Sequence, residues 1–129
     1  MKNYIKIASV LLIMTFSNCV QEEHEKKVTI QVDMNGVDNL ESVGIRGDFL
    51  PNQWRETVPM TDHNNDGIYE ISFSEKTAVY AIEFKFVKNN KEYELEGKDN
   101  RQLVFEYKPE TIVYKAKYNN NKDININRK

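Results

Sequence analysis

Apolar and polar residues alternate along several stretches of this chain with a period of two residues. Every second residue is apolar in 28–34, and Ile82, Phe84 and Phe86 alternate with charged residues in 80–87. A period of two is typical of a β-strand that buries one face. The same pattern recurs in shorter segments, and we therefore expect strands at 28–34, 42–49, 68–73, 80–87, 93–95, 103–107 and 112–118.

Turn-forming residue pairs separate the expected strands. They are Asn35-Gly36, Pro51-Asn52, Asp66-Gly67, Asn89-Asn90 and Lys108-Pro109. No window shows the sustained 3.6-residue period of a helix. About seven short strands at regular spacing predict an all-β fold, an immunoglobulin-like β-sandwich that spans residues 27–118. The segment 119–129 is rich in asparagine and lysine and is predicted to be a polar, disordered tail.

The N-terminal segment has a different pattern from the rest of the chain. Lys2 and Lys6 precede an uncharged, mostly apolar run at 7–16, and small polar residues follow this run. This order is typical of a secretory signal peptide, which we place at residues 1–18. The run is about half as long as the roughly 20 residues that a membrane-spanning helix needs. Residues 19–26 are then expected to form an acidic tether.

Cys19 is the only cysteine, so it forms no disulfide within the chain. The segment 16–19 resembles a lipobox, and this resemblance implies an acylated, palmitate-carrying Cys19 that anchors the protein in the outer membrane. A simple cleaved signal with a free cysteine is the alternative. The acidic stretch at 21–25 resembles the surface-export signal of Bacteroidetes lipoproteins, although a solvated tether would have the same composition.

The net charge and the catalytic residue types present limit the possible functions. Removal of residues 1–18 leaves 16 basic against 20 acidic residues, a net charge of −4, which does not favour nucleic-acid binding. The two histidines, His24 and His63, lie in the tether and in a turn, and no Gly-x-Ser-x-Gly motif is present. We therefore expect a non-catalytic protein without a cofactor.

One short motif could bind a metal ion. Asp62, Asn64, Asp66 and Gly67 match the opening of an EF-hand calcium loop. The twelfth position of that loop would be Phe73, which cannot ligate calcium. We favour a hairpin turn in which these polar side chains bond the local backbone, and keep calcium binding as the weaker alternative.

Seven short segments form an ordered series between residues 28 and 107. They are VTIQVDM at 28–34, VGIRGDF at 43–49, NQW at 52–54, PMTD at 59–62, DGIYE at 66–70, EFKFV at 83–87 and LEGKDNR at 95–101. This series resembles the starch-binding domains of carbohydrate-binding module family 20. It is also similar to the related family-48 modules, which include the glycogen-binding domain of AMP-activated kinase. The resemblance implies an immunoglobulin-like sandwich that binds α-glucans without cleaving them.

The resemblance also implies a set of glycan-binding residues. Trp54 matches the first stacking tryptophan of the family, and Lys85 and Asn100 match residues that hydrogen-bond sugar hydroxyls. Leu95 lies where the second stacking tryptophan is expected, and Tyr93 lies two residues earlier on the same strand face. Each residue also has a structural interpretation: Trp54 could cap the core, Lys85 could be an ordinary outward lysine, and Asn100 could shape a turn.

Two functions from different classes follow from these patterns. The first is a surface lipoprotein that binds α-glucan. The second is a cell-envelope module with the same fold that binds a protein partner through its aromatic surface or a strand edge and does not bind sugar.

Overall fold

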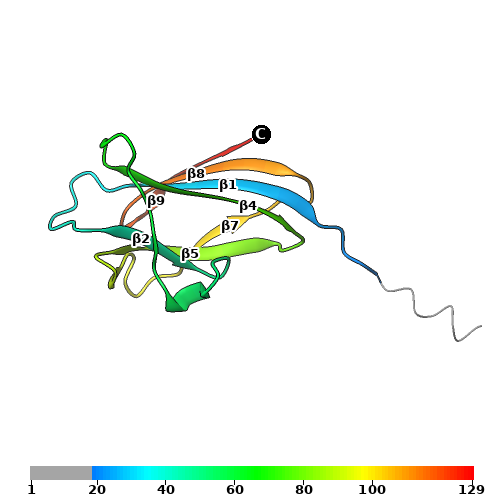
Figure 1. The fold of residues 1–129 in the computed structure, drawn as a ribbon, viewed down its shortest axis with the longest axis horizontal. Helices are drawn as coiled ribbons and strands as arrows, with labels where there is room; N and C mark the ends of the chain where they lie inside the picture. Colours follow the sequence, from blue (N-terminus) through cyan, green and yellow to red (C-terminus); the bar gives the residue numbers. More distant parts are fainter. Residues whose placement is uncertain (1–18) are drawn as a thin grey trace, which may run out of the picture.

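Two β-sheets contain all the strands in residues 19–129, the part of the chain that the computed structural model describes. Figure 1 shows them as two layers, with β1, β4 and β8 in one and β2 and β5 in the other. The first sheet has the order β4 (Ile68–Thr77), β1 (His24–Asp33), β8 (Glu110–Lys117) and β9 (Asn120–Arg128). The second has the order β3 (Val58–Pro59), β2 (Val43–Gly47), β5 (Ala81–Lys88) and β6 (Glu92–Tyr93), and β7 (Arg101–Val104) also pairs with β5. The predicted all-β sandwich is confirmed.

The core lies between the two sheets, where the inward residues of each strand meet. β1 pairs antiparallel with β4 and parallel with β8, so its inward side chains join those of β8 on one face. Across the core, the ring of Phe84 meets the ring of Tyr114 of β8 edge to face, with centroids 5.2 Å apart, and on its own strand it meets the ring of Phe86 edge to face at 5.7 Å. The alternation that predicted these strands therefore identifies the buried face correctly.

The C-terminal segment is not a disordered tail, and that prediction is wrong. β9 pairs antiparallel with β8 from Ile112 opposite Arg128 to Lys117 opposite Asn120. Its asparagine-rich composition hid a weak alternation, in which Ile124 and Ile126 lie on the inner face of the sheet. β9 is an edge strand with all nine residues exposed. Its sequence therefore shows little of the apolar alternation that burial of one strand face produces.

The expected boundaries at the N-terminus also change. β1 begins at His24, so three residues assigned to the acidic tether belong to the first sheet. The predicted signal peptide at 1–18 lies outside the described residues. Within 19–129 no helix is long and apolar enough to cross a membrane.

A buried lysine joins β1 to the connection between β7 and β8. The Nζ atom of Lys26 donates to the carboxylate of Glu110 at 2.7 Å and to the carbonyl oxygens of Glu106 and Lys108. Burial opposes the charge of Glu110, but hydrogen bonds from Lys26, the Glu106 amide and Arg128 outweigh it and lower the pKa of this carboxyl. A charge that is buried in this way must keep its partners.

Replacing this lysine should destabilise the fold. Lys26→Met leaves a buried carboxylate with fewer partners, and we expect the free energy of unfolding to fall by about 3 kcal/mol. Lys27→Met is the matched control, because the neighbouring lysine lies on the opposite face of β1 and its side chain is 59% exposed. Urea unfolding of both variants checks the prediction, and equal stabilities would contradict it.

Candidate functional site

The outer face of the second sheet carries most of the residues that the sequence singled out. Arg46 of β2 lies opposite Lys85 of β5, and both side chains point away from the core. Val87 is fully buried without belonging to the core cluster, so it is covered from the outer side. Its register partner is Tyr93 of β6. A polar and aromatic layer therefore lies over this face.

Trp54 lies on a single-turn 3₁₀ helix, η1 (Gln53–Arg55), in the connection between β2 and β3. The turn is fixed by backbone hydrogen bonds, one of which joins the Gln53 amide to the carbonyl oxygen of the buried Leu50. Trp54 itself is half-buried, and it belongs neither to the core cluster nor to the residues packed against that cluster. Part of its surface is thus accessible to a ligand.

Arg46 joins the Trp54 segment to Tyr93. Its Nη1 atom donates to the carbonyl oxygen of Trp54 at 3.3 Å and to the hydroxyl of Tyr93 at 2.8 Å. Its Nε atom donates to the hydroxyl of Thr57 at 2.7 Å, and its guanidinium carbon lies 5.2 Å from the centre of the Tyr93 ring. The planar guanidinium suits such a combination of directed hydrogen bonds and ring contact. Arg46 therefore links the backbone of Trp54 to the side chain of Tyr93.

Sequence reasoning missed the role of Arg46. The available signal was its outward position in the expected strand 42–49, with Gly44 two residues before it. A Cβ atom at Gly44 would come within 2.3 Å of the Thr57 side chain and 2.8 Å of the Val58 carbonyl oxygen. Glycine at this position lets the segment after η1 approach β2 closely enough for Thr57 to accept the Arg46 hydrogen bond.

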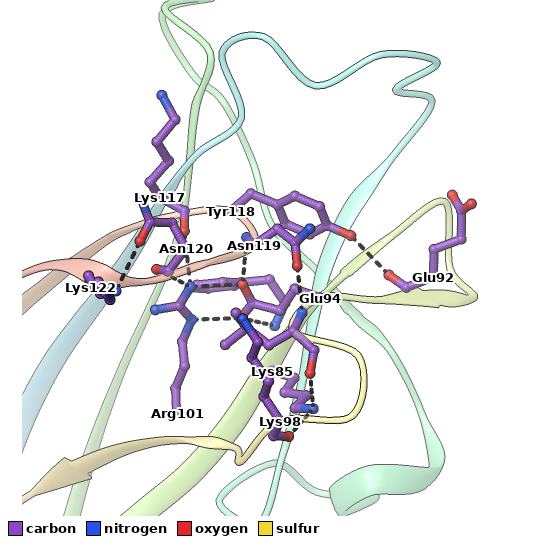
Figure 2. Close-up of polar contacts among 12 residues, drawn as sticks. Lys85, Glu92, Glu94, Lys98, Arg101, Lys117, Tyr118, Asn119, Asn120 and Lys122 are labelled. Carbon is purple, nitrogen blue, oxygen red and sulfur yellow. Dashed lines mark hydrogen bonds and ion pairs between the residues drawn. The ribbon is translucent and has the colours of Figure 1, made fainter.

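Lys85 points outward as predicted, but its ammonium group bonds the protein itself. The Nζ atom donates to the carbonyl oxygens of Leu95 at 3.0 Å and Lys98 at 2.9 Å, and Figure 2 shows both contacts. An ammonium group has three N–H donors, so one remains for a ligand. Lys85 thus holds the 95–98 loop against the sheet.

Leu95 cannot be part of a binding platform, and its assignment there is wrong. Its side chain is only 3% exposed, and its backbone has a φ of 48°. The strand ends at Tyr93, so the alternation that would place Leu95 beside Tyr93 stops before it. The Leu95 amide donates to the side-chain oxygen of Asn119, which fixes the turn. Tyr93, by contrast, is 39% exposed.

A buried ion pair fixes Glu94, the residue that directly precedes the 95–98 loop. The Glu94 carboxylate accepts hydrogen bonds from Arg101 Nε at 2.6 Å and Nη2 at 2.8 Å, and from the amides of Phe86 and Asn119 (Figure 2). Burial opposes the charge of Arg101, but the hydrogen bond and attraction of Glu94 outweigh it and raise the pKa of the guanidinium. The pair joins β5, β7 and the turn between β8 and β9.

Asn100 is exposed, and its hydrogen bond joins it to Glu83 rather than to the aromatic residues. Its Nδ2 atom lies 3.2 Å from the carboxylate of Glu83, which is two residues before Lys85 on β5. It also borders a hollow of about 470 Å³ between the 97–102 segment and β9. The structure therefore groups Trp54, Arg46 and Tyr93, and places Asn100 apart from them.

The polar turn at 62–67 bonds its own backbone. The Asp62 carboxylate accepts from the Gly67 amide at 2.9 Å, and the Asp66 carboxylate accepts from the Ile68 amide at 2.8 Å. Asn64 donates to Asp66. These bonds are the local pattern expected of a hairpin turn. Within residues 19–129 no group of three or more histidine, cysteine or acidic residues is arranged to hold a metal ion.

Comparison with known proteins gives one kind of match. No family model matches the chain, and no curated protein matches its sequence. Solved structures with a similar arrangement include CBM25-2 and CBM25-1 of the β/α-amylase from Paenibacillus polymyxa. CBM25-2 is 17% identical with a TM-score of 0.49, and the match covers 82% of this chain and 94% of that chain. CBM25-1 is 17% identical with a TM-score of 0.46, over 81% and 93%. Such likeness assigns no ligand, and the resemblance to families 20 and 48 stays a prediction.

Tyr118 should make the stability of this region sensitive to alkaline pH. Burial, with the charges of Glu94 and Glu92, raises the pKa of Tyr118 from 10.0 to about 12. Between these values the unfolded chain loses the proton first, so stability that is present below pH 10 is lost as the pH rises toward about 12. Tyr118→Phe should make this decline shallower in urea unfolding, while Tyr80→Phe, at an exposed site, should not. Identical declines in the two variants would contradict the assignment.

Proposed function

We propose that residues 24–128 form a non-catalytic binding module for α-glucans of the starch or glycogen type, anchored to the outer membrane through lipid on Cys19. The observation that supports a glucan site most is the hydrogen bonding of Arg46, which joins the Trp54 segment to Tyr93 on one outer face. The ordered segments that resemble starch-binding domains are the reason for proposing this type of glycan. Tyr93 takes the role that the resemblance gave to Leu95.

The chemistry of this face suits a sugar chain. Sugar rings present apolar C–H faces that pack on aromatic side chains, and their hydroxyls need directed donors and acceptors. Trp54 and Tyr93 supply partly exposed aromatic surface, and Lys85 keeps one N–H donor. These groups suit a neutral, flexible chain such as an α-glucan. Binding of such a chain needs no pair of catalytic residues.

The expected affinity is low. Each stacking contact contributes about 1–3 kcal/mol, judged by the burial of apolar side chains. The entropy of association opposes it, so we expect a Kd near about 1 mM, which corresponds to about −4 kcal/mol. Many anchored copies that engage one polymer would bind it far more tightly than a single copy. A lipid anchor at Cys19, which is exposed, would provide this crowding.

Loss of the second aromatic should weaken glucan binding. We expect maltoheptaose to change the fluorescence of Trp54, the only tryptophan. Tyr93→Ala should weaken binding by about fivefold or more, because it removes about 1 kcal/mol of ring contact. Tyr107→Ala removes an exposed tyrosine at the other end of the sandwich and should leave the affinity unchanged.

Two results would count against the glucan site. One is no fluorescence change at about 10 mM maltoheptaose, well above the expected Kd. The other is an equal loss of affinity in Tyr93→Ala and Tyr107→Ala, which would show that the glucan does not bind at the surface formed by Trp54, Arg46 and Tyr93.

The anchor has its own test. Cys19→Ala removes the thiol that acylation requires, so the protein should move from the membrane fraction to the soluble fraction of cells. Gln21→Ala is a control in the same segment that keeps the cysteine. Continued membrane association of Cys19→Ala would contradict lipid attachment and would leave the glucan measurements unaffected.

An envelope protein-interaction module is the second candidate function. β9 favours it, because an exposed edge strand offers unpaired backbone groups for strand addition by a partner. Its Ile124 and Ile126 are each 40% exposed. This function gains support where maltoheptaose produces no response at Trp54.

A further inference from the structure

The end of the sandwich at which β1 begins carries the most exposed apolar side chains of the described chain. Eight large apolar side chains are exposed in residues 19–129, and four of them are only 37–40% exposed. The other four are Val20, Val79, Tyr80 and Tyr107, with exposures of 54–87%. We call these four residues the anchor-end patch. Exposed apolar surface with a polar rim is typical of an interaction site.

Three separate segments build the anchor-end patch. Val20 lies in the segment before β1, Val79 and Tyr80 lie in the connection between β4 and β5, and Tyr107 lies between β7 and β8. Val79, Tyr80 and Tyr107, with Gln21 and His24, line one small hollow of about 90 Å³. Figure 1 shows the β4–β5 turn beside the start of β1, whereas the turn of η1 lies away from this end.

Hydrogen bonds and ring contacts fix the patch to the segment that follows Cys19. The Glu22 amide donates to the Tyr107 hydroxyl at 3.2 Å. The ring of His24 meets the Tyr107 ring edge to face, with centroids 4.6 Å apart. The Tyr80 carbonyl oxygen accepts from the Phe105 amide at 2.8 Å, which fixes the β4–β5 connection. The patch is thus held at the start of β1.

The distance from Cys19 to the patch is short. Five residue steps separate Cys19 from His24, and they span at most about 17 Å when fully extended. A lipid on Cys19 would therefore keep the patch within that distance of the headgroups. Such tethering raises the local concentration so far that a contact of low intrinsic affinity becomes populated.

We propose that the anchor-end patch rests on the lipid bilayer and sets the orientation of the anchored domain. This inference rests on the proposed lipid attachment at Cys19. Tyrosine rings favour the interface between headgroups and acyl chains, and valine side chains favour its apolar side. In this orientation the Trp54–Tyr93 face stays open to solution, because Tyr93 pairs with Val87 near the end of β5, whereas Val79 and Tyr80 directly precede the start of that strand.

The charges around the patch specify the type of lipid surface. Glu22 and Glu23 lie between Val20 and His24, whereas the nearby Glu25 and Glu106 are paired with Lys27 and Lys108. The carboxylates of Glu22 and Glu23 repel anionic headgroups. The contact is therefore one of aromatic and apolar side chains with a zwitterionic surface, and anionic lipid should weaken it.

The unique cysteine allows a direct test. All strands in the described part of the chain come from residues 24–128, so protein that begins at Cys19 contains both sheets. It can be coupled through its only thiol to a maleimide lipid in phosphatidylcholine vesicles. The reporter variant combines Trp54→Phe with Tyr80→Trp, and the control is the natural chain with Trp54. Acyl chains brominated near the headgroup quench tryptophan that lies at that depth. We expect the emission of the reporter to fall by about twofold and that of the control to stay unchanged.

Each alternative outcome overturns the inference. An unquenched reporter shows that the patch does not reach the bilayer, and equal quenching of reporter and control shows that the domain has no fixed orientation. Adding Val79→Asp to the reporter should abolish quenching while the thermal midpoint stays unchanged. If uncoupled protein instead self-associates in sedimentation and Val79→Asp prevents this, the patch binds a second copy. Because coupling supplies the anchor chemically, failure here is distinct from failure of acylation in the Cys19→Ala fractionation.

Discussion

The buried ion pair of Glu94 and Arg101 is the interaction on which the rest of this face depends. A carboxylate inside a protein is costly unless every lone pair finds a donor, and Glu94 accepts four hydrogen bonds. Arg101 adds bonds to the carbonyl oxygens of Lys117 and Asn120. The pair thereby joins β5, β7 and the β8–β9 turn, which come from distant parts of the chain. Loss of either partner would leave an uncompensated charge in the interior.

This constraint determines where the aromatic surface lies. Tyr93 immediately precedes Glu94, so the buried carboxylate holds the chain while the tyrosine ring remains outside. From there the Tyr93 hydroxyl meets Arg46, which also bonds the Trp54 segment. Lys85 holds the following loop by its two carbonyl contacts. The buried ion pair thus positions the aromatic surface of the site, and the proposed glucan binding needs no catalytic residue.

Much of the fold could be predicted from the alternation of apolar residues. The inward positions of Ile82, Phe84 and Phe86 follow from a period of two, because burial on one face of a strand enforces it. The turn at Asp62 to Asp66 follows from the tendency of these side chains to bond nearby amides. β9 escaped prediction because an exposed edge strand is stabilised by backbone pairing, which leaves almost no hydrophobic pattern.

The site was harder to predict than the fold for two physical reasons. Glutamate is rarely buried, so nothing in the sequence marks Glu94 as an interior residue, and its partner Arg101 is seven residues away. Leu95 was misplaced because alternation holds only while the strand continues, and the positive φ at Leu95 ends it. Arg46 acts through directed hydrogen bonds to segments that meet it only in the folded protein. Such contacts depend on tertiary structure and have no periodic signature.

Backbone amide shifts measured by NMR during a maltoheptaose titration test the central claim most directly. The account predicts that the largest shifts fall on Trp54, Arg46 and Tyr93, with smaller ones in the 95–98 loop that Lys85 holds. Shifts that concentrate on β9 or on the β4–β5 connection, with none at Trp54 and Tyr93, would contradict it.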